Sequence, residues 1–359
     1  MHVFQLVPRL RPMSCGIGDW AVALSDEWRQ TRQWETRFIA ADPAWVAGDD
    51  QMKSAASVIT VRNGEALARI WRDQGSDKLL LHYSGYGYAS RGAPVWLVQA
   101  VKRLRRSFPG IRVTTMFHEL FASGPPTSSA FWLSPVQRWV AAQVARLSDA
   151  VVTNRQESGL WLERHAPKQH GRVRVLPVFS SLGEAEDAPP PSQRENHLVF
   201  FGYQASAWGA DLGEIRRVLR VLHLDRVTIL GRAADIPADV FGTTRVDRTG
   251  WLDANAVSAI LRTARYGLLA YPPAYLGKSS ILAAFMAHGV VPVLVGGDKP
   301  LSEGLERGKH LLATADVTER LDPARLDSIS SAGLNWYRPH DRRNTAAAFA
   351  ELWNATNQP

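Results

Sequence analysis

The feature that most constrains the fold is a repeated alternation of short apolar runs with longer stretches of helical pattern. The runs predict strands at residues 3–7, 38–40, 79–83, 113–117, 150–153 and 173–177. Helical stretches lie between most of them, for example at 94–107 and 135–147. Such alternation is typical of a parallel sheet covered by helices on both faces. The sequence therefore predicts an α/β fold.

The alternation stops near residue 183 and restarts at residue 197. Residues 183–196 include the run Pro189-Pro190-Pro191 and lack apolar periodicity, which predicts a linker. After the restart, the pattern predicts strands at 197–201, 227–230, 267–271 and 291–295. It predicts helices at 211–222, 279–288 and 341–353, in addition to one at 20–32 in the first part of the chain. We expect two Rossmann-like domains, at 1–182 and 197–335, and a terminal helical segment at 336–359. Ligands of parallel sheets bind at the carboxyl ends of the strands, here in a cleft between the domains.

Composition narrows the class of protein further. The chain has 359 residues, of which 45% are hydrophobic and 21% charged, so it can bury a core and is not disordered. The single cysteine, Cys15, can form neither an internal disulfide nor a thiolate zinc site, which favours a reducing cytoplasm. No apolar run reaches the ~18 residues of a membrane-spanning helix. The net charge of +8 suits nucleic acid, anionic lipid or a phosphorylated small molecule, and does not choose among them.

Two segments of the first domain are candidates for chemistry. Gly16, Gly18 and Asp19 follow the first strand, where glycines allow a ligand to approach the backbone and Asp19 is placed to cap the next helix. A plain capped turn is the alternative interpretation. His118 closes the run 113–117, where it can bind a substrate hydroxyl or move a proton. Glu119 can hold the imidazole or cap the next turn. A histidine satisfied by a backbone carbonyl is the alternative there.

The second domain offers an anion site. Lys278, Ser279 and Ser280 stand where a loop enters a helix, so an ammonium, two hydroxyls and free backbone N–H groups converge. This combination suits a diphosphate, although the spacing is not that of a Walker A loop. An ordinary capped helix with a solvated lysine is the alternative. No residues have metal-ligand spacing, so we expect no metal.

Residues 95–106 predict a basic amphipathic helix. Between Tyr86 and His118 the chain has six basic residues and no acidic one. A helix of this kind can lie on an anionic membrane. It can also be a solvated helix with its apolar side in the core, and this second interpretation is favoured.

These segments, in this order, resemble a GT-B glycosyltransferase, most closely family 4. The turn at 15–19 resembles the family's Gly-Gly loop, and the strand end at 117–119 resembles its histidine segment. The block 284–293 resembles the family's Glu-Ala-Met-Ala-Ser-Gly-x-Pro-Val helix and turn, and the terminal helix resembles the one that returns to the first domain. The chain departs from the family at two places. The positions of the family's paired glutamates are occupied here by Leu276 and Ala284. The positions of the family's Gly-Arg and Lys-Gly pairs are occupied by Gly202-Tyr203 and Trp208-Gly209.

The resemblance implies transfer of a sugar from a nucleotide diphosphate sugar to an acceptor hydroxyl, with retention and without a metal or other cofactor. Lys278 and Arg232 would then replace the family's cations, and Tyr203 would stack on a base or a sugar. His118 would position the donor sugar, and Asp19 or His118 would be the base if the reaction inverts. The expected partners are the donor and a glycan or lipid-linked acceptor in exopolysaccharide or cell-surface glycan assembly. The expected place is the cytoplasm, peripheral on the inner membrane face through 95–106.

Other functions stay open. The missing glutamates favour a catalytically silent GT-B-fold binding or scaffold protein in a polysaccharide assembly complex. A nucleotide-sugar epimerase of similar build would need more charged residues in its cleft. The net charge invites nucleic-acid binding, but the sequence has no motif of basic and aromatic residues for stacking on bases, so no nucleic acid is expected.

Overall fold

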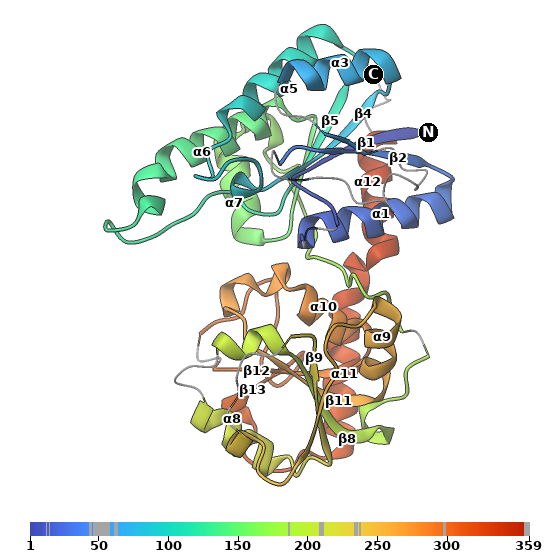
Figure 1. Cartoon of the computed structure of the whole chain (residues 1–359), viewed down its shortest axis with the longest axis vertical. Helices are drawn as coiled ribbons and strands as arrows, with labels where there is room; N and C mark the ends of the chain where they lie inside the picture. The colour runs from blue at the N-terminus through green and yellow to red at the C-terminus, as the bar shows by residue number, and fades with distance from the viewer. Residues whose placement is uncertain are drawn as a thin grey trace. The chain divides into compact units, whose positions relative to one another are not determined.

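A computed structural model of the chain describes residues 1–11, 13, 15–42, 45, 58–60, 64–185, 187–207, 212–232, 236, 238–296 and 299–354. The chain divides into two compact units (Figure 1). Unit 1 comprises Met1–Leu176 and Thr345–Pro359, and unit 2 comprises Pro177–Asn344. Each unit is a parallel sheet with helices on its faces, so the predicted α/β fold class is confirmed.

Among the described residues of unit 1, the sheet has seven strands in the order β3-β2-β1-β4-β5-β6-β7, all parallel. The strands are β1 His2–Val7, β2 Glu35–Ala40, β3 Val58–Thr60, β4 Lys78–Tyr83, β5 Arg112–Phe117, β6 Ala150–Thr153 and β7 Arg174–Val175. The helices are α1 Gly16–Arg32, α3 Gly64–Gln74, α4 Gly85–Tyr88, α5 Val95–Ser107, α6 Ser129–Leu147, α7 Gln156–His165 and α12 Arg342–Asn354.

Alternation along the strands of unit 1 decides which side chains meet which helices. Phe4, Leu81 and Val113 pack in a core with α3, α5 and α6. Residues one position along point to the other face, because the side-chain period of a strand is two. There Thr114 accepts a hydrogen bond from Trp353 Nε1 on α12 at 2.9 Å. This second face also carries the polar side chains of β1 and β4.

In the part of unit 2 that the structure describes, the sheet has six parallel strands in the order β10-β9-β8-β11-β12-β13. The strands are β8 Glu195–Phe201, β9 Arg226–Leu230, β10 Arg245–Arg248, β11 Ala264–Leu269, β12 Val291–Leu294 and β13 Leu312–Ala313. The helices are α8 Leu212–Val221, α9 Ala254–Thr263, α10 Ser280–Ala287 and α11 Pro323–Tyr337. β11 ends before the expected 271, where Pro272 and Pro273 have no N–H to donate to a ladder.

The segment expected as a linker, 183–196, lies inside unit 2. Arg194 holds it there, because its guanidinium donates to the carbonyls of Pro189, Ala264 and His288 at 2.6, 2.9 and 2.8 Å. The chain returns to unit 1 at Thr345 rather than at 336, since α11 belongs to unit 2. Within the described part of the chain, no helix combines the length and hydrophobicity needed to cross a membrane.

Candidate functional site

In unit 1, His118 belongs to a chain of three buried polar side chains at the carboxyl ends of the central strands. His118 Nε2 lies 3.1 Å from His82 Nδ1, and His82 Nε2 lies 2.7 Å from Gln5 Oε1. An amide oxygen only accepts, so His82 donates from Nε2 to Gln5. His82 Nδ1 therefore accepts from His118 Nε2–H. In its neutral form His118 then carries the lone pair on Nδ1.

The surroundings of His82 favour its neutral form. Burial, together with the neighbouring His118, holds the pKa of His82 well below its ordinary value. The Trp20 ring, from α1, packs in T-shaped geometry against both imidazoles. Its centroid lies 5.5 Å from that of His82 and 5.4 Å from that of His118. Sequence reasoning found His118 but missed His82 and Gln5. In the sequence, each of these two is a polar residue inside an apolar strand. Its role becomes visible only when the neighbouring strands are in place.

Glu119, expected to hold the imidazole or to cap the next turn, contacts the residue that follows β4. Its carboxylate accepts from Ser84 Oγ at 3.2 Å, which ties the end of β5 to the end of β4. His82 contributes to the orientation of the His118 ring through its contact with Nε2.

The segment of Gly16, Gly18 and Asp19 is the first turn of α1, not a loop before it. Cys15 is the N-cap, and its Sγ accepts from Gly18 N at 3.4 Å, so the expectation that Asp19 caps the helix is wrong. The helix starts earlier because a cap at Cys15 already satisfies an N–H of the first turn. Asp19 forms an ion pair with Arg11 at 3.0 Å instead. Gly18 lies against the backbone of Arg9, whereas the space beside Gly16 is open.

In unit 2, Lys278, Ser279 and Ser280 lie where the 3-10 helix Pro273–Lys278 meets α10. Ser279 is the N-cap, and its hydroxyl accepts from Leu282 N at 3.1 Å. Ser280 is exposed at the first helical position, where backbone N–H groups have no partner within the helix. Lys278 is half-buried, with Nζ 5.6 Å from the centre of the Tyr275 ring. Lys278 thus stands two residues before the positive end of the helix dipole.

Tyr203 and Arg232 lie along the same edge of the unit 2 sheet. Tyr203 follows β8 in the 3-10 helix Gly202–Ala207, and Arg232 follows β9. β9, β8 and β11 are neighbours, and Gln204 Oε1 accepts from Ala270 N at 3.4 Å, which joins the turn after β8 to the loop after β11. The structure therefore brings the five predicted site residues of unit 2 to one edge of the sheet: Tyr203, Arg232, Lys278, Ser279 and Ser280. The three neighbouring strands β9, β8 and β11 make this edge about 10 Å wide, which is two strand spacings. Trp208 and Gly209 lie outside the described residues.

Trp251 is a residue of this edge that sequence reasoning missed. It follows β10, and the bridge between Gly250 and Gly231 sets it beside the turn that carries Arg232. The Trp251 side chain is 78% exposed and that of Tyr203 is 64% exposed. Large aromatic rings left in water at strand ends are suited to stack on a flat ring. In the sequence, Trp251 shows only as a tryptophan that follows Gly250, and this pattern does not indicate a binding site.

The two positions that the family resemblance assigns to glutamates are inside the core. Leu276 and Ala284 are each 1% exposed. Leu276 is followed by buried Gly277, whose carbonyl accepts from Val178 N at 2.9 Å. A carboxylate at either place would lose its hydration, so the polar contacts of the site come from other residues.

The helix at 95–106 has its apolar side in the core of unit 1, as favoured. Leu97, Val101 and Leu104 of α5 are buried against α3 and α6. Arg105 forms two hydrogen bonds to Asp149, at 2.7 and 3.0 Å. The apolar side is thus not free to enter a membrane, and the outer face offers Lys102, Arg103 and Arg106.

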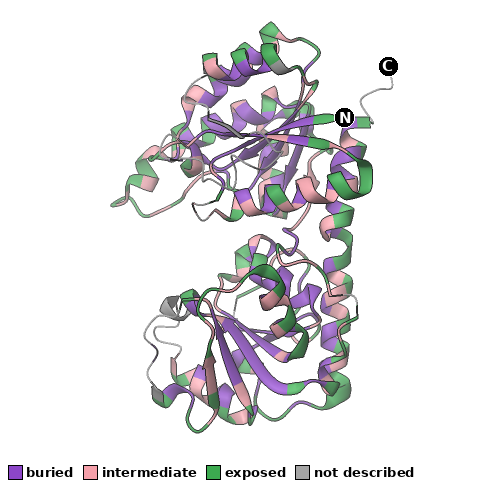
Figure 2. Cartoon of the chain, turned by 45° about the vertical axis from the view of Figure 1, so that its right-hand side comes forward, coloured by how far each residue is buried: buried purple, intermediate pink, exposed green. Residues whose placement is uncertain are grey.

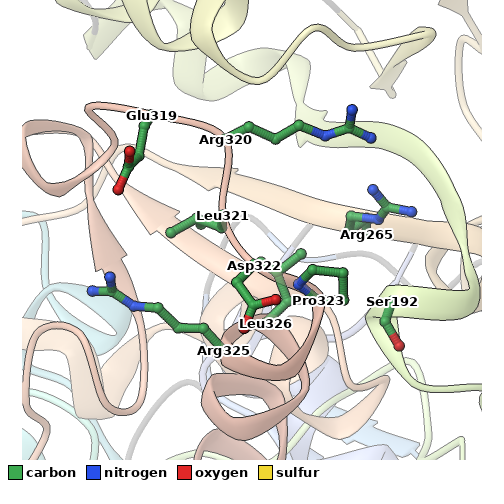
Figure 3. A pocket seen from close by; sticks show the side chains of 9 residues that line it. All are labelled: Ser192, Arg265, Glu319, Arg320, Leu321, Asp322, Pro323, Arg325 and Leu326. Atoms are coloured by element: carbon green, nitrogen blue, oxygen red, sulfur yellow. The ribbon is translucent and has the colours of Figure 1, made fainter.

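A cavity of about 490 Å³ lies elsewhere in unit 2, at the amino end of β11 (Figure 3). Arg265 and Arg320 extend to one side of it and Arg325 to the other (Figure 3). The Arg265 guanidinium donates to the carbonyls of Pro191 and Arg194, so its role is to hold backbone together. This cavity is at the opposite end of the strand from the candidate edge. Among the described residues, no cluster of three metal-binding side chains is present in either unit.

Comparison with known proteins gives similarity in structure alone. The sequence matches no protein family and no curated protein. The pneumococcal O-GlcNAc transferase GtfA, solved with UDP and GlcNAc, is similar with a TM-score of 0.66 at 9% identity, over 100% of this chain and 99% of that chain. The N-terminal domain of Candida albicans trehalose-6-phosphate phosphatase gives 0.60 at 11% identity, over 98% and 96%. An alpha-glucosyltransferase solved with UDP and a 13-mer DNA gives 0.59 at 12% identity, over 99% and 98%.

These similarities extend over the full length of the chain and show its fold. The protein is of the class with two parallel-sheet α/β units. Within that class the fold is GT-B, the fold of the glycosyltransferases among its structural neighbours. The predicted fold is confirmed, and the identities of 9–12% carry no more than the fold.

Proposed function

We propose that this protein is a glycosyltransferase that moves a sugar from a nucleotide diphosphate sugar to an acceptor hydroxyl. One observation carries the proposal: the carboxyl edge of the unit 2 sheet gathers two cations, two exposed aromatic rings and a helix N-terminus. These are Lys278, Arg232, Tyr203, Trp251 and the start of α10. A nucleotide diphosphate needs a stacking surface for its base and positive charge for its phosphates. A uridine nucleotide is the first choice, because UDP is held in two of the similar structures.

The donor end of the reaction follows from these charges. Breaking the bond between sugar and phosphate leaves negative charge on the diphosphate, and fixed positive groups lower the barrier most where that charge develops. The N–H groups at Ser280 begin α10, and Lys278 precedes them by two residues in the chain. The Ser279 hydroxyl keeps the helix start in place through Leu282 N. No step here passes through a metal or another cofactor.

In unit 1, the proposal assigns His118 to a hydroxyl of the donor sugar. Its Nε2–H is engaged by His82, so the ring is held in one tautomer with Nδ1 as the acceptor. In a retaining reaction the leaving phosphate can take the acceptor proton, and the protein need not supply a base. In an inverting reaction His118 or Asp19 takes that proton, and the ion pair with Arg11 makes Asp19 the weaker candidate.

The finer parts of the proposal rest on the family resemblance. They are a family 4-like enzyme, retention, and a role in exopolysaccharide or cell-surface glycan assembly in the cytoplasm. The acceptor is a glycan or a lipid-linked glycan, and nucleic acid is not proposed. One similar structure holds DNA, so an oligonucleotide belongs in any acceptor panel.

Nucleotide binding tests the donor site. We expect UDP, among UDP, GDP, TDP, ADP and CMP, to raise the melting temperature of the wild type. Lys278→Ala should weaken UDP binding by about ten-fold or more, because a charge-assisted bond to phosphate is lost. Lys309→Ala is the matched control, since Lys309 pairs with Glu306 on the surface of the same unit. Equal affinity of the two variants in calorimetry would place the diphosphate elsewhere.

A silent GT-B-fold scaffold protein is the second candidate, favoured by one observation. Leu276 and Ala284 close the two positions where the family carries its glutamates. A protein that binds UDP but neither hydrolyses nor transfers the sugar of any UDP-sugar would fit this candidate. Release of UDP from one donor, lost in His118→Ala, would exclude it.

A further inference from the structure

The first half of α6 carries apolar side chains on its outer side. Phe131, Trp132, Val136 and Trp139 are 43, 72, 42 and 46% exposed, and together they are named the α6 patch. Trp132, Val136 and Trp139 follow the spacing i, i+4, i+7, so they share one face of the helix. A contiguous apolar face in water is unusual on a single chain and marks a surface that meets a partner.

The first half of α6 buries a polar side chain on its inner side. Gln137 is fully buried; its Oε1 accepts from Ala122 N at 2.8 Å, and its Nε2 donates to the Arg91 carbonyl at 2.9 Å. The second half of α6 has the ordinary arrangement, with Val140 and Val144 buried and Arg146 exposed. The polarity of the helix therefore reverses along its length. Folding of unit 1 does not require the outer apolar residues, so another interaction must explain them.

The α6 patch is held in place by local bonds. Ser128 caps the helix, and Trp132 Nε1 donates to the Pro126 carbonyl at 2.9 Å. The Phe131 and Trp132 rings meet edge to face at 5.3 Å. This end of α6 and the loop before it project from the rest of unit 1 (Figure 1), and Figure 2 colours much of the projection as exposed.

The charge around the patch is positive. Residues 120–148 contain Arg138 and Arg146 and no acidic residue. Exposed Arg91 lies beside Gln137, and the Arg138 guanidinium lies 4.2 Å from the centre of the Phe121 ring. The acidic residues that bound this stretch are engaged, Glu119 by Ser84 and Asp149 by Arg105.

We propose that the α6 patch docks the protein on the lipid–water interface of an anionic bilayer. Tryptophan and phenylalanine enter the region between headgroups and acyl chains, while nearby arginines stay at the level of the lipid phosphates. A surface that projects from its unit can reach a flat, deformable bilayer. The interface residues are those of α6, not the basic face of α5.

Other occupants fit the patch less well. A second copy facing the same patch would set Arg138 and Arg91 against their own counterparts. A glycan needs several polar side chains for its hydroxyl groups, whereas the patch offers only indole N–H groups, and that of Trp132 is bonded to the Pro126 carbonyl. A nucleic acid binds through its charged backbone and by stacking its bases on aromatic rings, so the aliphatic Val136 would add nothing to its binding. The proposal does not rest on the transferase activity, because vesicle binding is measured without a donor.

The test is flotation of the full chain with vesicles of phosphatidylcholine, with and without about 30% phosphatidylglycerol. We expect binding to the anionic vesicles only. Trp132→Gln with Trp139→Gln should reduce it about ten-fold or more. Arg91→Gln with Arg138→Gln should reduce it about five-fold for each charge. Leu160→Gln, which removes a 49% exposed apolar side chain of α7, should leave vesicle binding unchanged, and unchanged melting temperatures show that the variants fold.

Several results would overturn the proposal. One is a wild type that floats with neither kind of vesicle. Another is retention of binding in the tryptophan variant together with its loss in Lys102→Glu, Arg103→Glu, Arg106→Glu, which would place the interface on α5. A third is a dimer, seen by analytical ultracentrifugation, that dissociates in the tryptophan variant. A fourth is an oligonucleotide that binds the α6 patch in place of lipid.

Discussion

Gly16 and Gly18 lie two positions apart in the first turn of α1, yet their surroundings differ completely. A Cβ on Gly18 would lie 2.3 Å from the Arg9 carbonyl oxygen, and a Cβ on Gly16 would meet nothing within 4 Å. Gly18 is therefore needed for the approach of α1 to the segment after β1. Gly16 is free of that demand, so only a ligand would require it to be glycine.

Alanine at the two positions should separate these roles. Gly18→Ala should lower the free energy of unfolding by about 2 kcal/mol or more, because a backbone atom has to move. Gly16→Ala should be neutral or stabilise by up to about 1 kcal/mol, since alanine lowers the entropy of the unfolded chain. Urea unfolding of both variants measures this. Equal losses in the two would contradict the packing argument.

At the scale of elements, α12 completes the core of unit 1. The Trp353 ring packs against Trp28 at 5.2 Å and Trp34 at 5.7 Å, while Trp28 Nε1 donates to the Ala346 carbonyl at 3.0 Å. This is a large buried aromatic cluster between the first helix and the last. The chain ends of unit 1 are thus joined by packing rather than by sequence proximity.

Trp353→Ala should cost about 3–5 kcal/mol of the free energy of unfolding of unit 1, because it leaves a cavity and an unpaired Thr114 hydroxyl. Trp132→Ala is the matched control, with an exposed ring and an expected change within about 0.5 kcal/mol. Chemical unfolding followed by circular dichroism compares them. A small loss in Trp353→Ala would mean that α12 docks weakly.

At the scale of the whole molecule, buried histidines make stability depend on pH. Burial lowers the pKa of His197 and that of His340 to about 4. Burial also lowers the pKa of His82 in unit 1 and of His288 in unit 2. The unfolded chain binds protons below its ordinary histidine pKa of about 6.5, while these folded sites stay neutral. Stability is therefore complete above about pH 6.5 and is lost as the pH falls toward 4.

At pH 5, His197 and His340 should each reduce the free energy of unfolding by about 2 kcal/mol relative to pH 7.5. Urea unfolding at the two pH values measures the sum. His340→Phe keeps an aromatic ring and should remove its share of the pH dependence. Equal stability of the wild type at pH 5 and pH 7.5 would show that these histidines are hydrated.

Much of the fold could be predicted from local pattern. Apolar runs such as those of β4 and β6 show a buried strand by themselves, because a strand covered on both faces has few polar positions. β10 was missed since its sequence, Arg-Val-Asp-Arg, shows no such run, and the strand exists because β9 lies beside it. The cap of α1 was misplaced at Asp19, because Cys15 is a weak capping residue whose role shows only in the folded turn.

The sequence by itself determined the two α/β units, the helix start at Ser279 and the strand-end position of His118, since each depends on neighbours in the chain. Only the tertiary structure decided that His82 and Gln5 engage His118, that Trp251 joins Arg232 and Tyr203 at one edge, and that Leu276 and Ala284 lie in the core. It also turned the apolar side of α5 inward and that of the first half of α6 outward. The physical reason is the same in each case: strand order and helix rotation are set by long-range packing, which periodicity along the chain does not encode.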